Sequence, residues 1–289
     1  MTLPTMVPHG RDEVLAWCRA VDDGPWSSLA VPERITFRNH ALVPQLAAAA
    51  ALTERVRLWT TIVVLPAHPA TQVAKDMASI DVLSGGRLTL GIGVGGREHD
   101  YRAVGAPFTN RWQHMDDQVA QMRRVWAGEP PFEGADPVGP PPVQAGGPPL
   151  VAGALGPKAL ARAAQWAVGV DDASTIFGID PHNLAAAVAR IRAAWEAAGR
   201  PERPHVSASL WYALGADAAP RLQTYAADYM RIFGEPVAEQ SAAMVRTDSP
   251  AALREAVAFA TEAGCDELFL VPTTADVTEL DRTRDALGI

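Results

Sequence analysis

The sequence predicts an α/β protein, a (β/α)8 TIM barrel that forms a single domain over residues 1–289. Two observations support this prediction. Short apolar segments alternate along the chain with segments of helical periodicity, which is the pattern of parallel strands joined by helices. Eight strand segments occur, and a chain of 289 residues is of the usual length for such a barrel.

The strand segments are short apolar runs, and the third is especially rich in β-branched side chains. The first has the weakest signal, because it is brief and contains a proline. In chain order we expect strands over residues 4–7, 26–34, 56–66, 87–94, 150–154, 168–172, 205–215 and 265–272.

The helical segments repeat apolar residues three and four positions apart, as Val14, Cys18 and Val21 do in the first of them. We expect helices over residues 10–21, 39–54, 69–84, 111–128, 156–167, 181–199, 219–234, 249–264 and 277–288. After the fourth helix, residues 128–149 are too rich in proline and glycine for regular structure. We expect them to form an irregular insertion that passes over the mouth of the barrel.

An open, doubly wound sheet is the alternative architecture. It would use residues 91–96 (GIGVGG) as a dinucleotide-binding loop at the end of a strand. The glycine spacing does not match that fingerprint, and a charged segment follows instead of a packed helix. The barrel is therefore the preferred prediction.

Composition and charge exclude several classes of function. A formal net charge of −8 argues against a protein that binds nucleic acid. The sequence shows neither a signal peptide nor an apolar run long enough to span a membrane, so we expect a cytoplasmic protein. The two cysteines, Cys18 and Cys265, are far apart and no other ligand cluster is visible, so no metal site is expected.

An ordered series of motifs between Leu52 and Arg111 resembles the luciferase-like monooxygenase superfamily, whose barrel enzymes use FMN or the deazaflavin coenzyme F420. The series comprises LSGGR at residues 83–87, Gly-x-Gly at the end of the next strand, an acidic–aromatic pair, Gly-x-Pro-Phe and an arginine. Weaker similarity continues to residue 272, so the resemblance covers nearly the whole chain. It implies F420 as the cofactor, with FMN as the alternative, a small organic substrate and a homodimer.

Three segments are candidates for binding the cofactor. Gly93 and Gly95 end a strand, where missing side chains leave room for a ring, although close packing is an alternative reason for glycine. Residues 153–156 form a small-residue loop before a helix that begins at Pro157, and the free amides of that helix favour a phosphate. The resemblance implies a cis peptide at Thr61–Ile62 that lies against the ring; an ordinary core strand is the alternative. The expected cofactor-binding residues are Thr60, Thr61, Ile62, Gly93, Gly95, Gly153, Ala154, Leu155 and Gly156.

Candidate catalytic residues are Glu33, Arg34 and His68, which follow two of the expected strands. Glu33 suits a base, and His68 suits proton transfer or substrate orientation. Many members of the resembled family have a histidine where this chain has Arg34, which cannot donate a proton near neutral pH but can hold an anion. Gly96 stands where the F420-dependent sugar-phosphate dehydrogenases have a catalytic glutamate, which argues against that activity.

The sequence therefore predicts an oxidoreductase that transfers a hydride between F420 and a small organic substrate, or a monooxygenase if the cofactor is FMN. Two alternatives stay open. One is a non-catalytic barrel that binds a flavin, and the other is a barrel lyase or isomerase that acts on a phosphorylated substrate through the same phosphate loop.

Overall fold

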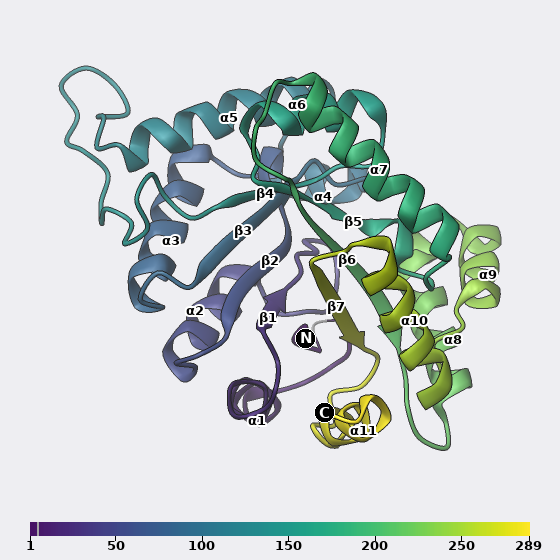
Figure 1. Cartoon of the computed structure of the whole chain (residues 1–289). Helices are drawn as coiled ribbons and strands as arrows, with labels where there is room; N and C mark the ends of the chain where they lie inside the picture. Colours follow the sequence, from purple (N-terminus) through teal and green to yellow (C-terminus); the bar gives the residue numbers. More distant parts are fainter. Residues whose placement is uncertain (5) are drawn as a thin grey trace.

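Seven parallel strands form one sheet in the computed structural model, which describes residues 1–4 and 6–289. They follow one another around the sheet in chain order, and the helices lie outside them (Figure 1). This sequential order excludes the doubly wound alternative, in which the strand order reverses. The strands are β1 (Ser28–Val31), β2 (Arg57–Val64), β3 (Leu88–Gly93), β4 (Leu150–Gly153), β5 (Gly169–Asp172), β6 (His205–Tyr212) and β7 (Glu267–Pro272).

The first residues of the chain close the gap between β7 and β1. The amide of Thr2 donates a hydrogen bond to the carbonyl of Leu270 in β7 at 3.1 Å, and the amide of Leu3 donates to Ala30 in β1 at 2.9 Å. Figure 1 shows the chain start between these two strands. The predicted barrel is therefore confirmed.

The expected first strand over residues 4–7 is wrong. Pro4, Met6 and Val7 belong to no strand, and Thr5 lies outside the described residues. The pairing is made by residues 1–3 instead, and it stops at Pro4, because proline has no backbone N–H to donate to a neighbouring strand.

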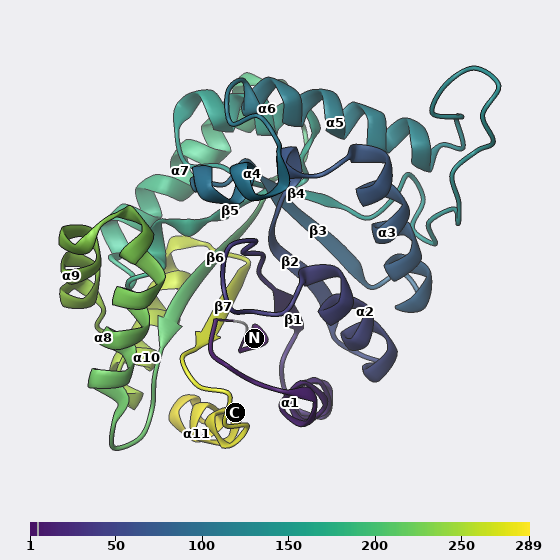
Figure 2. The same cartoon turned by 180° about the vertical axis from the view of Figure 1, so that it is seen from behind.

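The expected helices are present within a few residues of their expected bounds, and α4 and α9 are additional. Figure 2, seen from behind Figure 1, brings α4 to the front, at the end of the barrel to which β3 points. The helices are α1 (Arg11–Asp23), α2 (Leu42–Leu52), α3 (Ala70–Leu83), α4 (Glu98–Val104), α5 (Arg111–Trp126), α6 (Pro157–Trp166), α7 (Pro181–Ala197), α8 (Ala218–Met230), α9 (Glu235–Met244), α10 (Pro250–Ala263) and α11 (Thr278–Leu287), with single 3-10 turns at Leu65–Ala67, Ala173–Thr175 and Arg231–Phe233.

The segment between α5 and β4, residues 127–149, contains no helix or strand, and its expected course over the barrel mouth is wrong. The Gln144 side chain donates hydrogen bonds of 2.7 Å to the carbonyl of Leu88, where β3 begins, and to Asp81 near the end of α3. A helix-to-strand connection starts and ends at the N-terminal ends of the strands, opposite the mouth. Figure 1 shows this loop beside α3.

The inside of the barrel is filled by the buried side chains of Ala30, Trp59, Val151 and Phe269, with the rings of Trp59 and Phe269 5.3 Å apart. Alternate residues of a strand point to the same side, so the next inward layer, two residues further along each strand, lies nearer the mouth. Three residues at those positions, Pro32, Thr61 and Gly153, border a cavity.

No helix within the described part of the chain is long and apolar enough to cross a membrane.

Candidate active site

A cavity of about 810 Å³ lies at the C-terminal ends of the strands. Its wall comes from the ends of β1 to β6, from the start of α6 and from the end of α8. Ten of the twelve residues predicted from the sequence for the site line this cavity: Glu33, Arg34, Thr61, Ile62, Gly93, Gly95, Gly153, Ala154, Leu155 and Gly156.

The structure does not place Thr60 or His68 on the cavity wall. Thr60 is buried, and its hydroxyl donates a hydrogen bond of 2.7 Å to the carbonyl of Gly91. Neighbouring residues of a strand point to opposite sides, so Thr60 faces away from the side on which Thr61 lies. His68 is connected to the cavity wall by its hydrogen bond with Glu33.

The peptide bond between Thr61 and Ile62 is cis, as the resemblance implied. The pairing of β2 with β3 shifts in register next to it. A Cβ atom on Gly91 would lie 2.1 Å from the carbonyl oxygen of Thr60, so glycine is required there for backbone packing. A Cβ atom on Gly93 would lie 2.9 Å from Cδ1 of Ile62 on the cavity wall.

Gly153 and Gly96 are less crowded than Gly93, whereas a Cβ atom on Gly95 would lie 3.0 Å from Cγ1 of Val64. A Cβ atom on Gly153 would meet its nearest atoms, in Ile62 and Ile92, at 3.6 Å, which is ordinary contact. A Cβ atom on Gly96 would meet nothing within 4 Å. Gly95 has a φ of +59°, a conformation that favours glycine. Close packing thus explains Gly91, whereas Gly96 and Gly153 border open space.

The loop over residues 153–156 leads directly into α6, with Gly156 as the N-cap and Pro157 as the first helical residue. Lys158 and Arg162 also line the cavity at this end, and Arg162 pairs with Asp116. Leu155 is 54% exposed, which leaves a large apolar side chain uncovered at the rim. Free helix amides, a lysine and an apolar rim suit a ligand that carries both a phosphate and a ring.

Glu33 forms a hydrogen-bonded pair with His68. Oε2 of Glu33 accepts from the amide of Val64 at 2.7 Å, and Oε1 lies 3.0 Å from Nε2 of His68. The hydrogen bond to Glu33 raises the pKa of His68, and burial opposes part of the rise. The His68 side chain is 29% exposed, so the pair connects solvent with the cavity wall.

We expect Glu33→Gln to lower the pKa of His68 toward its ordinary value of about 6.5, measured by NMR titration with exposed His182 as the reference signal. Because the folded pKa of His68 is raised, the protonated imidazole stabilises the fold below about pH 6.5. This contribution is lost as the pH rises through the folded pKa. Glu33→Gln should therefore lower the free energy of unfolding more below that window than above it, and an unchanged His68 pKa would contradict the pairing.

Arg34, which follows β1, and Arg97, which follows β3, add positive charge to the cavity wall beyond that of Lys158 and Arg162. The guanidinium of Arg34 lies between the rings of Phe37 and Tyr229, with its central carbon 4.0 and 4.1 Å from the ring centres. Nε of Arg97 donates to Asp100 at 3.2 Å. Arg97 and Asp100 also line the cavity.

Asp171, at the end of β5, lines the cavity although we expected no role for it. It is 8% exposed and accepts a hydrogen bond of 3.2 Å from the hydroxyl of Ser207. Burial raises the pKa of Asp171 to about 6, the charge of Asp172 adds to the rise, and the Ser207 bond opposes it. The signal in the sequence was two carboxylates that end a predicted strand on the side of the mouth.

Among residues 1–4 and 6–289, no group of three or more histidine, cysteine, aspartate and glutamate side chains is arranged to hold a metal ion.

A family model described as "Luciferase-like monooxygenase" matches residues 4–288. Among solved structures, the monooxygenase RslO1 from Streptomyces bottropensis superposes with a TM-score of 0.78 at 21% identity, over 99% of this chain and 96% of that one. The coenzyme F420 dependent tetrahydromethanopterin reductase from Methanopyrus kandleri gives 0.72 at 17% identity, over 97% and 95%. At these identities the likeness shows a shared fold.

Among curated proteins, the F420-dependent glucose-6-phosphate dehydrogenase of Beutenbergia cavernae is 31% identical over 128 residues, which are 40% of this chain and 38% of that protein. The chain matches about half the length, or less, of the curated relatives it resembles.

Proposed function

The chain belongs to the luciferase-like monooxygenase family, and from this premise we propose that it is an oxidoreductase that binds F420, or alternatively FMN, in the cavity at the strand ends. The observation that carries the proposal is the cavity of about 810 Å³, which has a helix N-terminus at one end and acidic and basic side chains at the other. A non-catalytic binder would not need that second, polar end.

The residues of the cavity fit such a cofactor. Gly153 leaves a slot beside Ile62 that a larger residue at this position would fill, whereas Cδ1 of Ile62 itself takes up the space at Gly93. Residues 153–156, the first amides of α6 and Lys158 would hold the phosphate. When bound, F420 or FMN supplies a ring that gives or accepts a hydride, and FMN also supplies reaction with oxygen.

The protein's own part is to bind, orient and move protons. Glu33 faces the cavity and exchanges a proton with His68, which contacts solvent. Asp171 is a second group that can take up and release a proton near neutral pH, because burial brings its pKa to about 6. The apolar walls around Ile62 and Leu155 exclude water from the ring.

In this proposal the substrate is not a sugar phosphate. Gly96 lies on the cavity wall with open space around it, where those family members carry a catalytic glutamate. The lyase or isomerase alternative uses the same loop for a phosphorylated substrate and needs no ring cofactor.

The test is a titration of the purified protein with oxidised and reduced F420, with FMN and with riboflavin, followed by calorimetry and by quenching of tryptophan fluorescence. Trp112 lines the cavity and reports on its occupancy. We expect saturable binding of F420 or FMN, and weaker binding of riboflavin than of FMN, because riboflavin lacks the phosphate. Absence of binding by both cofactors would overturn the proposal and favour the phosphorylated-substrate barrel.

The homodimer, the cytoplasmic location and the single-domain organisation stay predictions.

A further inference from the structure

Arg34 is a buried charge with unused hydrogen-bond donors. It is 5% exposed, yet it belongs to the cavity wall. Its Nη2 donates to the carbonyl of Tyr229 at 3.2 Å, whereas Nε and Nη1 are buried without a hydrogen-bond partner among the described residues. Buried polar groups are nearly always paired, and an uncompensated buried charge destabilises a protein. A ligand in the cavity would supply the missing hydrogen-bond partner for this arginine.

The surroundings of Arg34 carry an excess of positive charge. Nη1 of Arg97, on the same wall, also has no partner in the described part of the chain. The nearby carboxylate of Asp100 is already engaged, because one oxygen accepts from the amide and hydroxyl of Thr36 and the other from Nε of Arg97. Asp100 therefore pairs with Arg97, and no carboxylate among the described residues forms an ion pair with Arg34. Burial lowers the pKa of Arg34 to about 10, which leaves it charged at neutral pH.

We propose that Arg34, with Arg97 beside it, is a subsite for an oxyanion, and that this oxyanion is a carboxylate of the organic substrate. The inference deepens the proposed function and rests on it for the existence of a substrate. A guanidinium held between two rings keeps its N–H groups in a fixed plane, which suits recognition of a carboxylate.

The cofactor phosphate is the other possible source of an oxyanion, and the topology argues against it. The loop over residues 153–156 follows β4, whereas Arg34 follows β1, and β2 and β3 lie between these two strands. A phosphate at the start of α6 therefore leaves Arg34 for a second anionic group. Tyr229 covers one face of the guanidinium and itself lines the cavity, so in this proposal the ligand displaces this half-buried side chain while Phe37 keeps its contact with the guanidinium.

The experiment compares benzoate with its neutral counterpart benzamide by calorimetry, on the free protein and on the protein saturated with whichever cofactor binds. Arg34→Met removes the charge and retains apolar volume between the rings, and Arg34→Lys keeps the charge without the planar donors. Arg124→Met is the matched control, because the Arg124 side chain is 60% exposed, pairs with Glu129 at 3.9 Å and does not line the cavity. We expect wild-type protein to prefer benzoate and Arg34→Met to weaken benzoate binding by about tenfold or more.

Stability gives a readout that separates a ligand role from a structural one. Removal of a buried charge with two unpaired donors should raise the melting temperature of Arg34→Met, whereas loss of a structural arginine would lower it. Cofactor affinity should stay near the wild-type value. Equal benzoate binding by wild type and Arg34→Met, or a lowered melting temperature, would overturn the inference. Loss of cofactor binding with benzoate binding unchanged would assign the anion to the cofactor and overturn it as well.

The two proposals fail in different ways. If benzoate binding depends on Arg34 while neither F420 nor FMN binds the wild type, the anion subsite stands and the oxidoreductase proposal falls. If a cofactor binds and benzoate does not, the oxidoreductase proposal stands and the anion subsite falls.

Discussion

Replacement of Gly153 by valine is expected to leave the barrel folded and to weaken binding of the proposed cofactor by about ten- to hundredfold, which corresponds to the usual overpacking cost of about 1–3 kcal/mol. The Cβ atom itself fits, because its nearest neighbours in Ile62 and Ile92 are 3.6 Å away. Valine is also favoured in strands such as β4. The branched methyl groups would occupy the slot beside Ile62 in which we place the ring.

The measurement is the dissociation constant of F420 and of FMN, taken together with the melting temperature of each variant. Gly153→Ala should have an intermediate effect, because its single methyl group occupies less of the slot. Ala186→Val is the control, because Ala186 is exposed on α7 and far along the chain from the cavity residues of β4. Wild-type affinity for both cofactors in Gly153→Val would show that the ring does not pass over β4 and would overturn its placement.

The sequence predicts the barrel well because the strand and helix signals depend on local side-chain periodicity. β2, for example, was evident from its β-branched residues, and α10 from its apolar spacing. The additional helices are harder to see: α4 has only seven residues, and α9 exposes most of its surface. The error over residues 127–149 had another cause, since the side of the barrel on which a loop lies follows from what it connects. A helix-to-strand loop belongs opposite the mouth.

The site was predictable where short motifs end the strands, as at Gly93 and in the loop over residues 153–156, and the cis Thr61–Ile62 bond was expected from the family resemblance. It was less predictable where side chains from distant segments meet. Asp171 acquires its raised pKa from burial inside the closed barrel. Arg34 is covered by Phe37, three residues away, and by Tyr229 of α8, 195 positions later in the chain. No pattern near residue 34 shows that Tyr229 will lie over it.

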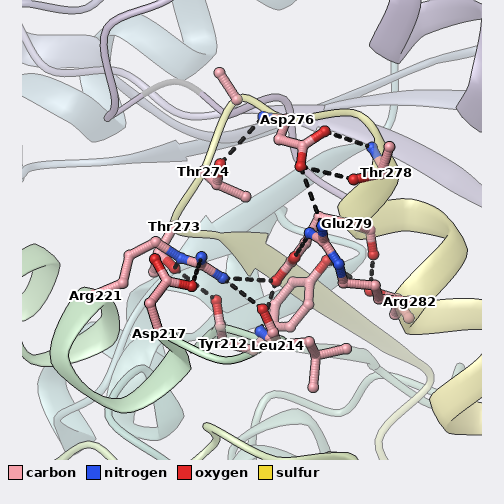
Figure 3. Close-up of polar contacts among 12 residues, drawn as sticks. Tyr212, Leu214, Asp217, Arg221, Thr273, Thr274, Asp276, Thr278, Glu279 and Arg282 are labelled. Carbon is pink, nitrogen blue, oxygen red and sulfur yellow. Dashed lines mark hydrogen bonds and ion pairs between the residues drawn. The ribbon is translucent and has the colours of Figure 1, made fainter.

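A buried carboxylate at the start of α11 ties the last helix to the end of β6 and to α8. Glu279 is fully buried and accepts hydrogen bonds from the amide of Leu214 at 2.7 Å, from Arg282 at 2.8 Å and from Arg221 at 3.3 Å (Figure 3). Arg221 lies in α8, the helix that carries Tyr229 at its other end. This network therefore positions the helix that covers Arg34.

We expect Glu279→Gln to lower the free energy of unfolding by about 3 kcal/mol, since removal of one partner from a buried ion pair typically costs about 3–5 kcal/mol. The lower end applies because the side chains of Arg221 and Arg282 are 21% and 41% exposed and regain some hydration. The glutamine side chain would also place its own N–H donors against the N–H groups of Leu214, Arg221 and Arg282, which now donate to Glu279. The measurement is urea unfolding at neutral pH.

Asp281→Asn is the matched control, because it makes the same chemical change two residues away in α11. The Asp281 side chain is 66% exposed and pairs with half-exposed Arg284 at 2.9 Å, so its loss should change the free energy of unfolding by less than about 0.5 kcal/mol. Equal effects of the two substitutions would mean that water reaches Glu279 and that the network does not fix α11 to α8. A large loss confined to Glu279→Gln, accompanied by weaker benzoate binding, would connect this network to the position of Tyr229 over the anion subsite.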